Sequence, residues 1–318
     1  MTPGLAVALV CHGRTSWAAG YGVADQAKGQ PVTRATRFQA ASVSKPVTAW
    51  GVLRLVGQGR IGLDEPVVGH LRRWRPPPSP FQAEAITVRR LLSHTAGLSV
   101  HGYAGQTLER PLPQIEASLS GEAGGSFPVE LLDAPGRQWL YSGGGYSVLQ
   151  LLVEGLTGRP FADVMQTEIL DALSMTASSF HWRRTAATAC PHDAEGGRIP
   201  DFAFTEQAAA GLVTTAPDLA RLSPPRCPAP RASLWGEGCS PRPGCGWPSP
   251  PPPALRAAGG LDMAWDCCLL VSGWPTTRAP IGAGGPVWHC CLPAGPESWC
   301  WLTVTSAAPP STPWSSSG

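Results

Sequence analysis

The amino-acid composition changes abruptly near residue 222, and this change limits how much of the chain can fold as one unit. Residues 1–222 contain 2 of the 10 cysteines, whereas residues 223–318 contain 8, together with 8 of the 13 tryptophans and 19 of the 35 prolines. Only 9 Asp, Glu, Lys or Arg residues fall in that last stretch. A segment so rich in proline and so poor in charge is atypical of a globular domain. We therefore expect a folded domain over 1–222 and a poorly ordered tail over 223–318.

The charge and hydropathy of the chain argue against several classes of protein. The net charge is +2 and no run of basic residues occurs, so we expect no nucleic-acid partner. No apolar stretch approaches the length of a membrane span, and residues 1–4 lack the features of a signal peptide. We therefore expect a cytoplasmic protein, unless an upstream segment is missing. The tail cysteines lack the C-x-x-C pairs of a zinc site, and we expect neither a metal nor a cofactor.

Hydrophobic periodicity predicts strands at the start of the chain and helices after them. Residues 5–10 and 16–23 predict a β-hairpin. From residue 42 onward apolar side chains recur every three residues, and Pro46 fits only the first turn of a helix, so a helix is predicted over 42–57. Further helices are predicted over 89–92, 146–156 and 161–173. Strands followed by helices indicate an α/β or α+β enzyme.

Ser42 and Lys45 form an S-x-x-K pattern at the start of the first predicted helix. A spacing of three residues puts both side chains on one helix face, so the amine can approach the hydroxyl. Serine is a weak nucleophile and needs a neighbouring base, a role that a desolvated lysine can take. The helix N-terminus adds unpaired N–H groups that favour a developing anion. Ser44 cannot share a face with the adjacent Lys45, so Ser42 is the predicted nucleophile.

The S-x-x-K pattern is not specific by itself, but other segments accompany it. With 25 serines and 2 lysines, chance yields roughly one such match in six chains of this length. The stretch FQAASVSKPVTA (38–49) resembles the active-site helix of class C β-lactamases, D-alanyl-D-alanine carboxypeptidases and related esterases. Segments of that family also match, in order, LDEPV (63–67), LLSHTAGL (91–98), YSGGGY (141–146) and AGLVTT (210–215). On these five matches the chain is identified as a member of the serine β-lactamase and penicillin-binding-protein-like superfamily.

The resemblance implies a fold and a catalytic partner for Ser42. The fold would be an antiparallel sheet flanked by helices, plus a helical lobe, with Ser42 at their boundary. Tyr141 corresponds to the tyrosine of the family's Y-x-N motif. Its phenol would share the Ser42 proton with Lys45 and pass it to the leaving group.

The same resemblance bears on substrate binding. Gly143 replaces the asparagine of the Y-x-N motif, which argues against a specialised β-lactamase and favours an esterase-like member. We expect Gly143 and His101 to contribute to the substrate site. His94 lies beside Ser93, but adjacency along a chain does not make a catalytic pair, and its segment looks structural in this family.

The family's third motif, K-T-G or H-x-G, is missing from the tail. In the family it lies on a strand that supplies a donor to the oxyanion hole, so the catalytic domain over 1–222 is expected to be incomplete, with its C-terminal strands missing or disordered. Read in the neighbouring frame, residues 261–268 permit a Tyr-Gly-Leu-Gly strand typical of the family, and residues 280–283 permit H-x-G. These matches predict a frameshift near residues 222–224, which resequencing of the gene would test.

These observations leave three functional hypotheses. The first is a serine hydrolase that acts through an acyl-enzyme on small esters, amides such as β-lactams, or D-amino-acid peptides. The second is a penicillin-recognising binding protein without turnover. The third is an inactive, frameshifted product. The sequence does not specify the natural substrate or the oligomeric state.

Overall fold

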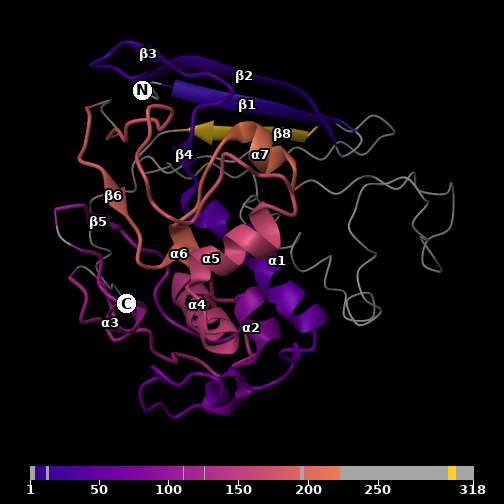
Figure 1. Ribbon diagram of the computed structural model, residues 1–318. Coiled ribbons are helices and arrows are strands. Elements are labelled where there is room, and N and C mark those ends of the chain that lie inside the picture. The colour runs from indigo at the N-terminus through magenta and orange to yellow at the C-terminus, as the bar shows by residue number, and fades with distance from the viewer. Residues whose placement is uncertain are drawn as a thin grey trace, which may run out of the picture.

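The computed structural model describes most of the first 222 residues and one segment of the C-terminal part. The described residues are 4–11, 14–109, 111–124, 126–193, 197–222 and 300–305. In Figure 1 a sheet lies across one side of a group of helices. No helix within these ranges is long and apolar enough to cross a bilayer.

The main sheet contains four antiparallel strands in the order β3-β2-β1-β8. β1 (Gly4–Cys11) and β2 (Arg14–Asp25) form the predicted hairpin, and the short β3 (Gln30–Pro31) pairs with the end of β2. Ala6 and Ala8 alternate along β1 and are both fully buried, as expected for a strand with one face on the core.

The fourth strand comes from the C-terminal part. β8 (Cys300–Thr305) pairs antiparallel with β1, from Leu5 opposite Thr305 to Val10 opposite Cys300. The expectation that the C-terminal strands are missing therefore does not hold for this segment. Strand pairing uses main-chain hydrogen bonds, so the free edge of β1 can accept a segment whatever its side chains. Residues 261–268 and 280–283, where the third motif was sought in the other frame, lie outside the described residues.

Helices fill the space below the sheet. Those of the described part are α1 (Ser44–Gly57), α2 (Val88–Leu92), α3 (Ile115–Leu119), α4 (Gly143–Thr157), α5 (Phe161–Met165), α6 (Gln207–Ala210) and α7 (Ala216–Ala220). Four short strands form two further two-stranded antiparallel sheets. β4 (Phe38–Gln39) pairs with β7 (Val213–Thr214), and β5 (Gln106–Thr107) pairs with β6 (Phe202–Ala203). α7 packs on β1, β2 and β8, and the other helices form a lobe further from the sheet (Figure 1). The antiparallel sheet and helical layer confirm the α+β fold class.

The two long helices agree with the sequence prediction apart from their ends. The helix predicted from Ser42 is a 3₁₀ turn, η1 (Ala41–Val43), that continues into α1. α4 begins three residues before the prediction because the Ser142 hydroxyl caps it, accepting the Gly145 N–H at 2.8 Å. It ends at Gly158, whose φ of 69° provides the left-handed cap.

The helix predicted over 161–173 is interrupted. α5 passes into a π-helical turn, η4 (Gln166–Leu170), which lies against α1. α1 and α4 bury the largest part of their surfaces in the lobe, and Val47 and Leu149 are each fully buried. Burial of one such side chain contributes about 1.5–3 kcal/mol, so this lobe is the main apolar support of the residues at the start of α1.

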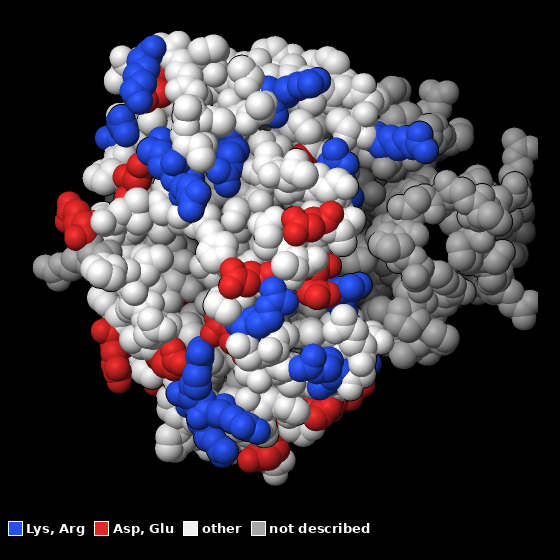
Figure 2. Space-filling view, viewed as in Figure 1, with Lys and Arg blue, Asp and Glu red and all other residues white. Residues whose placement is uncertain are grey.

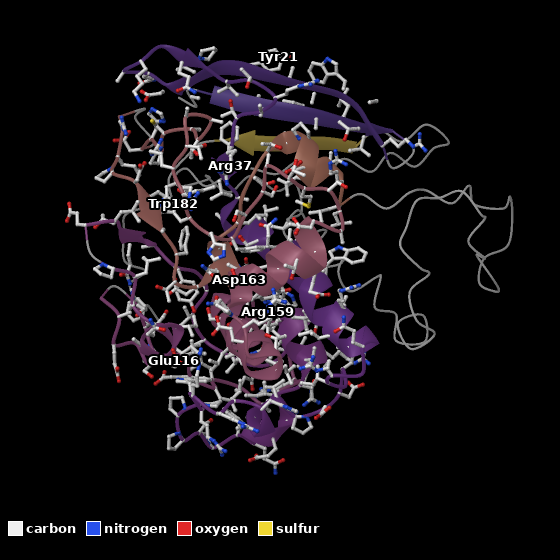
Figure 3. All side chains as sticks on the ribbon, in the orientation of Figure 1. Tyr21, Arg37, Glu116, Arg159, Asp163 and Trp182 are labelled. Atoms are coloured by element: carbon white, nitrogen blue, oxygen red, sulfur yellow. The ribbon has the colours of Figure 1, made fainter. Side chains whose placement is uncertain are left out.

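The surface carries charges of both signs. Figure 2 shows Lys and Arg interspersed with Asp and Glu on the face drawn there. On the sheet, Tyr21 of β2 is 52% exposed and points away from the helices (Figure 3). It contacts Trp17, with 6.5 Å between the ring centroids.

Candidate active site

The structure brings the amine of Lys45 to the hydroxyl of Ser42. Lys45 Nζ donates to Ser42 Oγ at 3.2 Å and to the carbonyl oxygen of Ala209 at 3.0 Å. The Lys45 side chain is almost fully buried, whereas Ser42 is half-buried. The hydrogen bond to α6 thus holds the lysine, and the serine remains partly open to solvent.

A tight turn sets the position of Ser42. Ala41, directly before it, has a φ of 44°, an uncommon conformation for a residue with a Cβ. Ser44 holds this turn, because its hydroxyl donates to the Ala41 carbonyl at 2.6 Å and accepts the Leu212 N–H at 2.9 Å. The hydroxyl of Ser44 is therefore committed to structure. Strained backbone next to a reactive group is a feature of functional sites.

The short helix α6 is fixed between α1 and α4. Thr48 Oγ1, one turn after Lys45, donates to the Ala208 carbonyl at 2.9 Å. From α4, the side chain of Gln150 accepts the Ala208 N–H at 3.1 Å and donates to the Thr205 carbonyl at 3.0 Å. Every one of these groups is buried, and buried hydrogen bonds of this kind hold their elements in one arrangement.

Tyr141 lies beside Lys45. Lys45 Nζ is 5.0 Å from the centre of the Tyr141 ring and 5.7 Å from that of Tyr146. A cation at this distance over an aromatic face is attracted to it. Of the residues singled out in the sequence, the structure thus brings Ser42, Lys45 and Tyr141 into one site.

His94 supports Tyr141 in a way that the sequence did not reveal. Its ring centroid lies 4.4 Å from that of Tyr141 and 5.3 Å from that of Tyr146. The side chain is 4% exposed, and the backbone has a φ of 57°. Nδ1 accepts the Ser142 N–H at 3.1 Å, so the ring proton of the neutral form lies on Nε2. Burial, and then the charge of Lys45, lower the pKa of His94 to about 3.

His101 and Gly143 meet at the entrance of the same site. The His101 ring centroid is 4.7 Å from that of Tyr141, and desolvation followed by the Lys45 charge lowers the pKa of His101. The Gly143 N–H donates to the His101 carbonyl at 3.2 Å. A Cβ on Gly143 would lie 3.0 Å from that oxygen and 3.2 Å from Tyr103 Cε2. Gly143 therefore allows the loop that carries His101 to lie directly on the start of α4.

Two hydrogen-bonded pairs, Tyr103 with Ser147 and Glu206 with Ser118, were not predicted from the sequence. The Tyr103 hydroxyl lies 2.8 Å from Ser147 Oγ, and burial raises the pKa of Tyr103. Glu206, at the start of α6, accepts a hydrogen bond from Ser118, and burial raises the pKa of this carboxyl. No periodic pattern marks these residues, because they come from separate loops and helices. Within the described ranges, no group of three or more His, Cys, Asp or Glu side chains could hold a metal ion.

Comparison with known proteins identifies the family. The family model described as Beta-lactamase matches residues 1–244, which is more than half of this chain. The chain belongs to the beta-lactamase family. The resemblance drawn from the five motifs is thereby confirmed.

Individual relatives include both esterases and penicillin-binding proteins. Esterase EstB of Burkholderia gladioli is 34% identical over 188 residues, covering 55% of this chain and 46% of EstB. Penicillin-binding protein 4* of Bacillus subtilis (strain 168) is 27% identical over 182 residues, covering 55% of this chain and 38% of that protein. The chain thus spans about half, or less, of these curated relatives.

Among solved structures, the octameric penicillin-binding protein homologue from Pyrococcus abyssi has a TM-score of 0.58 and 26% identity to this chain. The match covers 69% of this chain and 51% of that one. These values show that this member of the beta-lactamase family shares the fold of the penicillin-binding-protein type.

Proposed function

We propose that the protein is a serine hydrolase in which Ser42 forms an acyl-enzyme. The observation that carries this proposal is the 3.2 Å hydrogen bond between Lys45 Nζ and Ser42 Oγ in a largely buried setting. A base within hydrogen-bond reach of a hydroxyl is what nucleophilic catalysis by serine requires. The family membership supports the same reaction class.

In the proposed reaction, Ser42 Oγ attacks the carbonyl carbon while its proton passes to the neutral amine form of Lys45. The transfer is direct, or it runs through the Tyr141 hydroxyl, which gives its own proton to the amine as it takes that of Ser42. The bond to the leaving group then breaks, and this proton goes to the leaving oxygen or nitrogen. Water attacks the remaining ester, releasing the acid and restoring the hydroxyl of Ser42. The positive dipole end at the start of the helix favours the oxyanion.

We further propose carboxylic esters as the preferred substrates, ahead of β-lactams and D-amino-acid peptides. Gly143 stands where the family's specialised β-lactamases carry asparagine, so the amide that would bind a β-lactam is absent at that position. His101 lies over Gly143 and contacts Tyr141, so it is the side chain that we assign to the entrance of the substrate site. Similarity to esterase EstB agrees with this choice.

Hydrolysis of nitrophenyl acetate by the purified full chain tests the proposal. We expect Ser42→Ala to abolish turnover and to remove the acetyl adduct seen by mass spectrometry in the unmodified protein. Ser16→Ala, at an exposed position on β2, is the matched control and should keep full activity. Turnover that survives in Ser42→Ala would assign the activity elsewhere.

A penicillin-recognising protein without turnover is the second candidate. The observation that favours it is the missing K-T-G or H-x-G motif in the sequence after residue 222. Stable labelling of Ser42 by a fluorescent penicillin, with no release of the label and no ester hydrolysis, would support this candidate over the hydrolase.

We also propose that residues 1–222 are an incomplete catalytic domain and that most of 223–318 is read out of frame. The composition change near residue 222 and the family-like peptides in the neighbouring frame support this. Resequencing across codon 222 tests it, since one uninterrupted frame to residue 318 contradicts it. Restoring the frame should then raise activity.

A further inference from the structure

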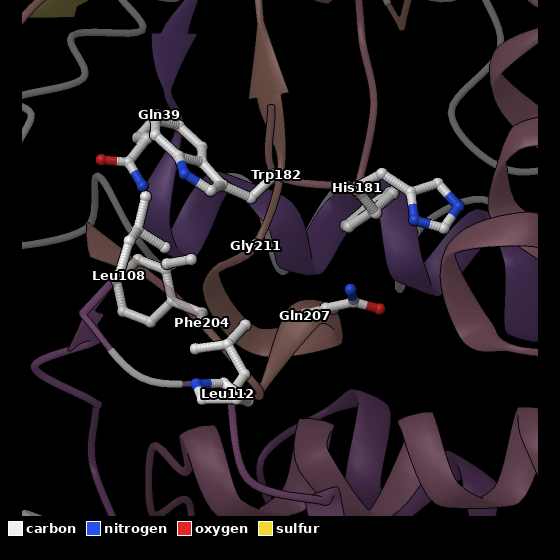
Figure 4. Close-up of a pocket in the computed structure, with 11 residues that line it drawn as sticks. Gln39, Leu108, Leu112, His181, Trp182, Phe204, Gln207 and Gly211 are labelled. Atoms are coloured by element: carbon white, nitrogen blue, oxygen red, sulfur yellow. The ribbon is translucent and has the colours of Figure 1, made fainter. Parts of the chain in front are cut away.

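A cavity of about 380 Å³ lies between α6, β6 and the segment that follows β5 (Figure 4). Most of its lining side chains are aromatic or aliphatic: Leu108, Leu112, Phe180, Trp182 and Phe204. In Figure 4 Leu108, Leu112 and Phe204 gather at one end, and Trp182 lies beside Gln39 at the other. The cavity has the size of a small ligand pocket.

The cavity adjoins the nucleophile. Gln39 in its wall precedes Ser42 by three residues, so their Cα atoms are at most roughly 11 Å apart. Gly211 also lines the cavity and is followed by Leu212, whose N–H donates to Ser44 Oγ at 2.9 Å. The segments of Gln39 and Gly211 lie side by side, since the Ala40 N–H donates to the Leu212 carbonyl at 2.8 Å, so this part of the cavity wall is within a few residues of Ser42.

Helix α6 separates the cavity from the proton-transfer groups. Gln207 at its start lines the cavity, whereas the carbonyl of Ala209, two residues on, accepts the hydrogen bond of Lys45. Tyr141 is not among the cavity's lining residues in the described part of the chain. A leaving group departs toward the groups that protonate it, here Tyr141 and Lys45, which leaves the side of the cavity for the acyl group.

We propose that this cavity is the acyl pocket of the Ser42 site, and that it selects an uncharged apolar acyl group such as a six-carbon chain or a phenyl ring. The proposal rests on the hydrolase function proposed above and narrows its substrate class.

The chemistry of the lining explains this selectivity. No Lys, Arg, Asp or Glu lines the cavity within the described residues. His181 is bound at Nε2 to Asp163 Oδ1 at 2.7 Å, and Figure 4 shows its ring directed away from the neighbouring lining side chains. A charged acyl group would lose its water here without gaining a Lys, Arg, Asp or Glu side chain of opposite charge among the described lining residues. An apolar chain instead gains about fourfold in binding for each methylene that it buries.

Kinetics on a pair of esters test the pocket. We expect kcat/KM for nitrophenyl hexanoate to exceed that for the acetate by at least about tenfold. Leu112→Trp, which fills the cavity, should lower this hexanoate-to-acetate ratio by at least about tenfold. Leu132→Trp makes the same change at a side chain that is 55% exposed and outside the cavity, and should leave the ratio unchanged. Trp182→Ala, which enlarges the cavity, should shift the preference toward octanoate.

The outcomes separate the pocket from the hydrolase function. If acetate is hydrolysed in a Ser42-dependent way but Leu112→Trp and Trp182→Ala both leave the chain-length preference unchanged, the pocket is wrong and the hydrolase stands. If no ester is hydrolysed, the hydrolase fails, and binding tests the pocket by ligand-observed NMR. Hexanamide should then bind the unmodified protein and Ser42→Ala alike, and bind more weakly to Leu112→Trp. Equal binding of hexanamide and its cationic 6-amino analogue would overturn the pocket.

Discussion

The two sides of the site are held by different forces. On one side, Lys45 and Thr48 of α1 donate hydrogen bonds to carbonyl oxygens of α6, and we call this side the anchored wall. On the other side, the rings of His94 and His101 each contact the ring of Tyr141, and we call this side the ring wall. The anchored wall is almost completely buried. In the ring wall His94 is buried as well, but Tyr141 is half-buried and His101 is exposed.

This difference separates two tasks. Directional hydrogen bonds fix one atom, Lys45 Nζ, within reach of Ser42 Oγ, which proton transfer requires. Ring contacts are less directional, and they leave room for a loop to adjust around a substrate. A change in the anchored wall should therefore act mainly on the chemical step. A change that disturbs the ring contacts should act mainly on stability, on pH dependence and on KM, whereas loss of the Tyr141 hydroxyl alone should act on kcat.

The largest effect is expected for Lys45→Met. Methionine preserves most of the buried volume but removes the amine, so kcat/KM for ester hydrolysis should fall roughly a thousandfold or more. The Ala209 carbonyl loses its partner, which should lower the free energy of unfolding by about 1–3 kcal/mol. Lys28→Met is the matched control, because the Lys28 side chain is 74% exposed. A folded Lys45→Met protein with more than a tenth of the original activity contradicts the assignment.

The next largest effect is a loss of unfolding free energy at acidic pH, caused by His94 of the ring wall. The pKa of His94 is about 3 in the folded protein against an ordinary value of 6.5. Between these values the unfolded chain binds more protons, so this stabilisation is complete above about pH 6.5 and is lost as the pH falls toward 3. From pH 7 to pH 4 the unfolding free energy should fall by roughly 3 kcal/mol on account of this one group.

Denaturant titrations of His94→Asn at both pH values check this expectation. Asparagine tolerates the left-handed backbone of residue 94 and does not titrate, so the variant should show the smaller pH dependence. His181→Asn, at an exposed histidine bound to Asp163, should behave as the unmodified protein does. Equal pH dependence in all three proteins would contradict the buried, neutral state of His94.

Tyr141→Phe separates the phenol from the ring. The ring contacts with His94 and His101 survive, so the midpoint of thermal unfolding should stay the same. If the hydroxyl relays the proton, kcat should fall about a hundredfold with little change in KM. Tyr21→Phe, on the exposed face of the sheet, provides the control. A loss of stability with unchanged kcat would give Tyr141 a structural part only.

The sequence predicted the Ser42–Lys45 pair better than the ring wall, and the reason is physical. The approach of Lys45 to Ser42 follows from helical spacing, which is local. The contact of Tyr141 with Lys45 joins distant segments, and only the family resemblance indicated it. His94 was interpreted as part of a structural segment, and nothing local indicates that its ring meets Tyr141. The cavity beside α6 draws its walls from several separate stretches, so no motif predicts it.

The fold shows the same division. The hairpin and the long helices followed from periodicity, since each buries one face on the core. The pairing of β8 with β1 did not, because main-chain hydrogen bonds carry little information about sequence. The proposed domain boundary at residue 222 rests on the composition change and on the family-like peptides in the neighbouring frame, and the gene sequence is its test.

The smallest expected effect arises where the ring wall meets α4. Gly143→Ala places a Cβ 3.0 Å from the His101 carbonyl oxygen, and that oxygen also accepts the Gly143 N–H, so the loop must move. Overpacking of this kind costs about 1–2 kcal/mol of unfolding free energy. Because the displaced loop carries His101, KM for ester substrates should rise severalfold while kcat changes little.

Gly69→Ala is the control for this last prediction, since a Cβ there meets nothing within 4 Å. Gly143→Asn extends the test by restoring the family's side chain at the same position. Both the missing amide and the loop over Gly143 disfavour β-lactams. A side chain at this position meets the His101 carbonyl and the Tyr103 ring, so the asparagine variant should gain no acylation by a fluorescent penicillin. Faster acylation in Gly143→Asn would show that the ring wall yields, and that the missing amide alone directs this site toward esters.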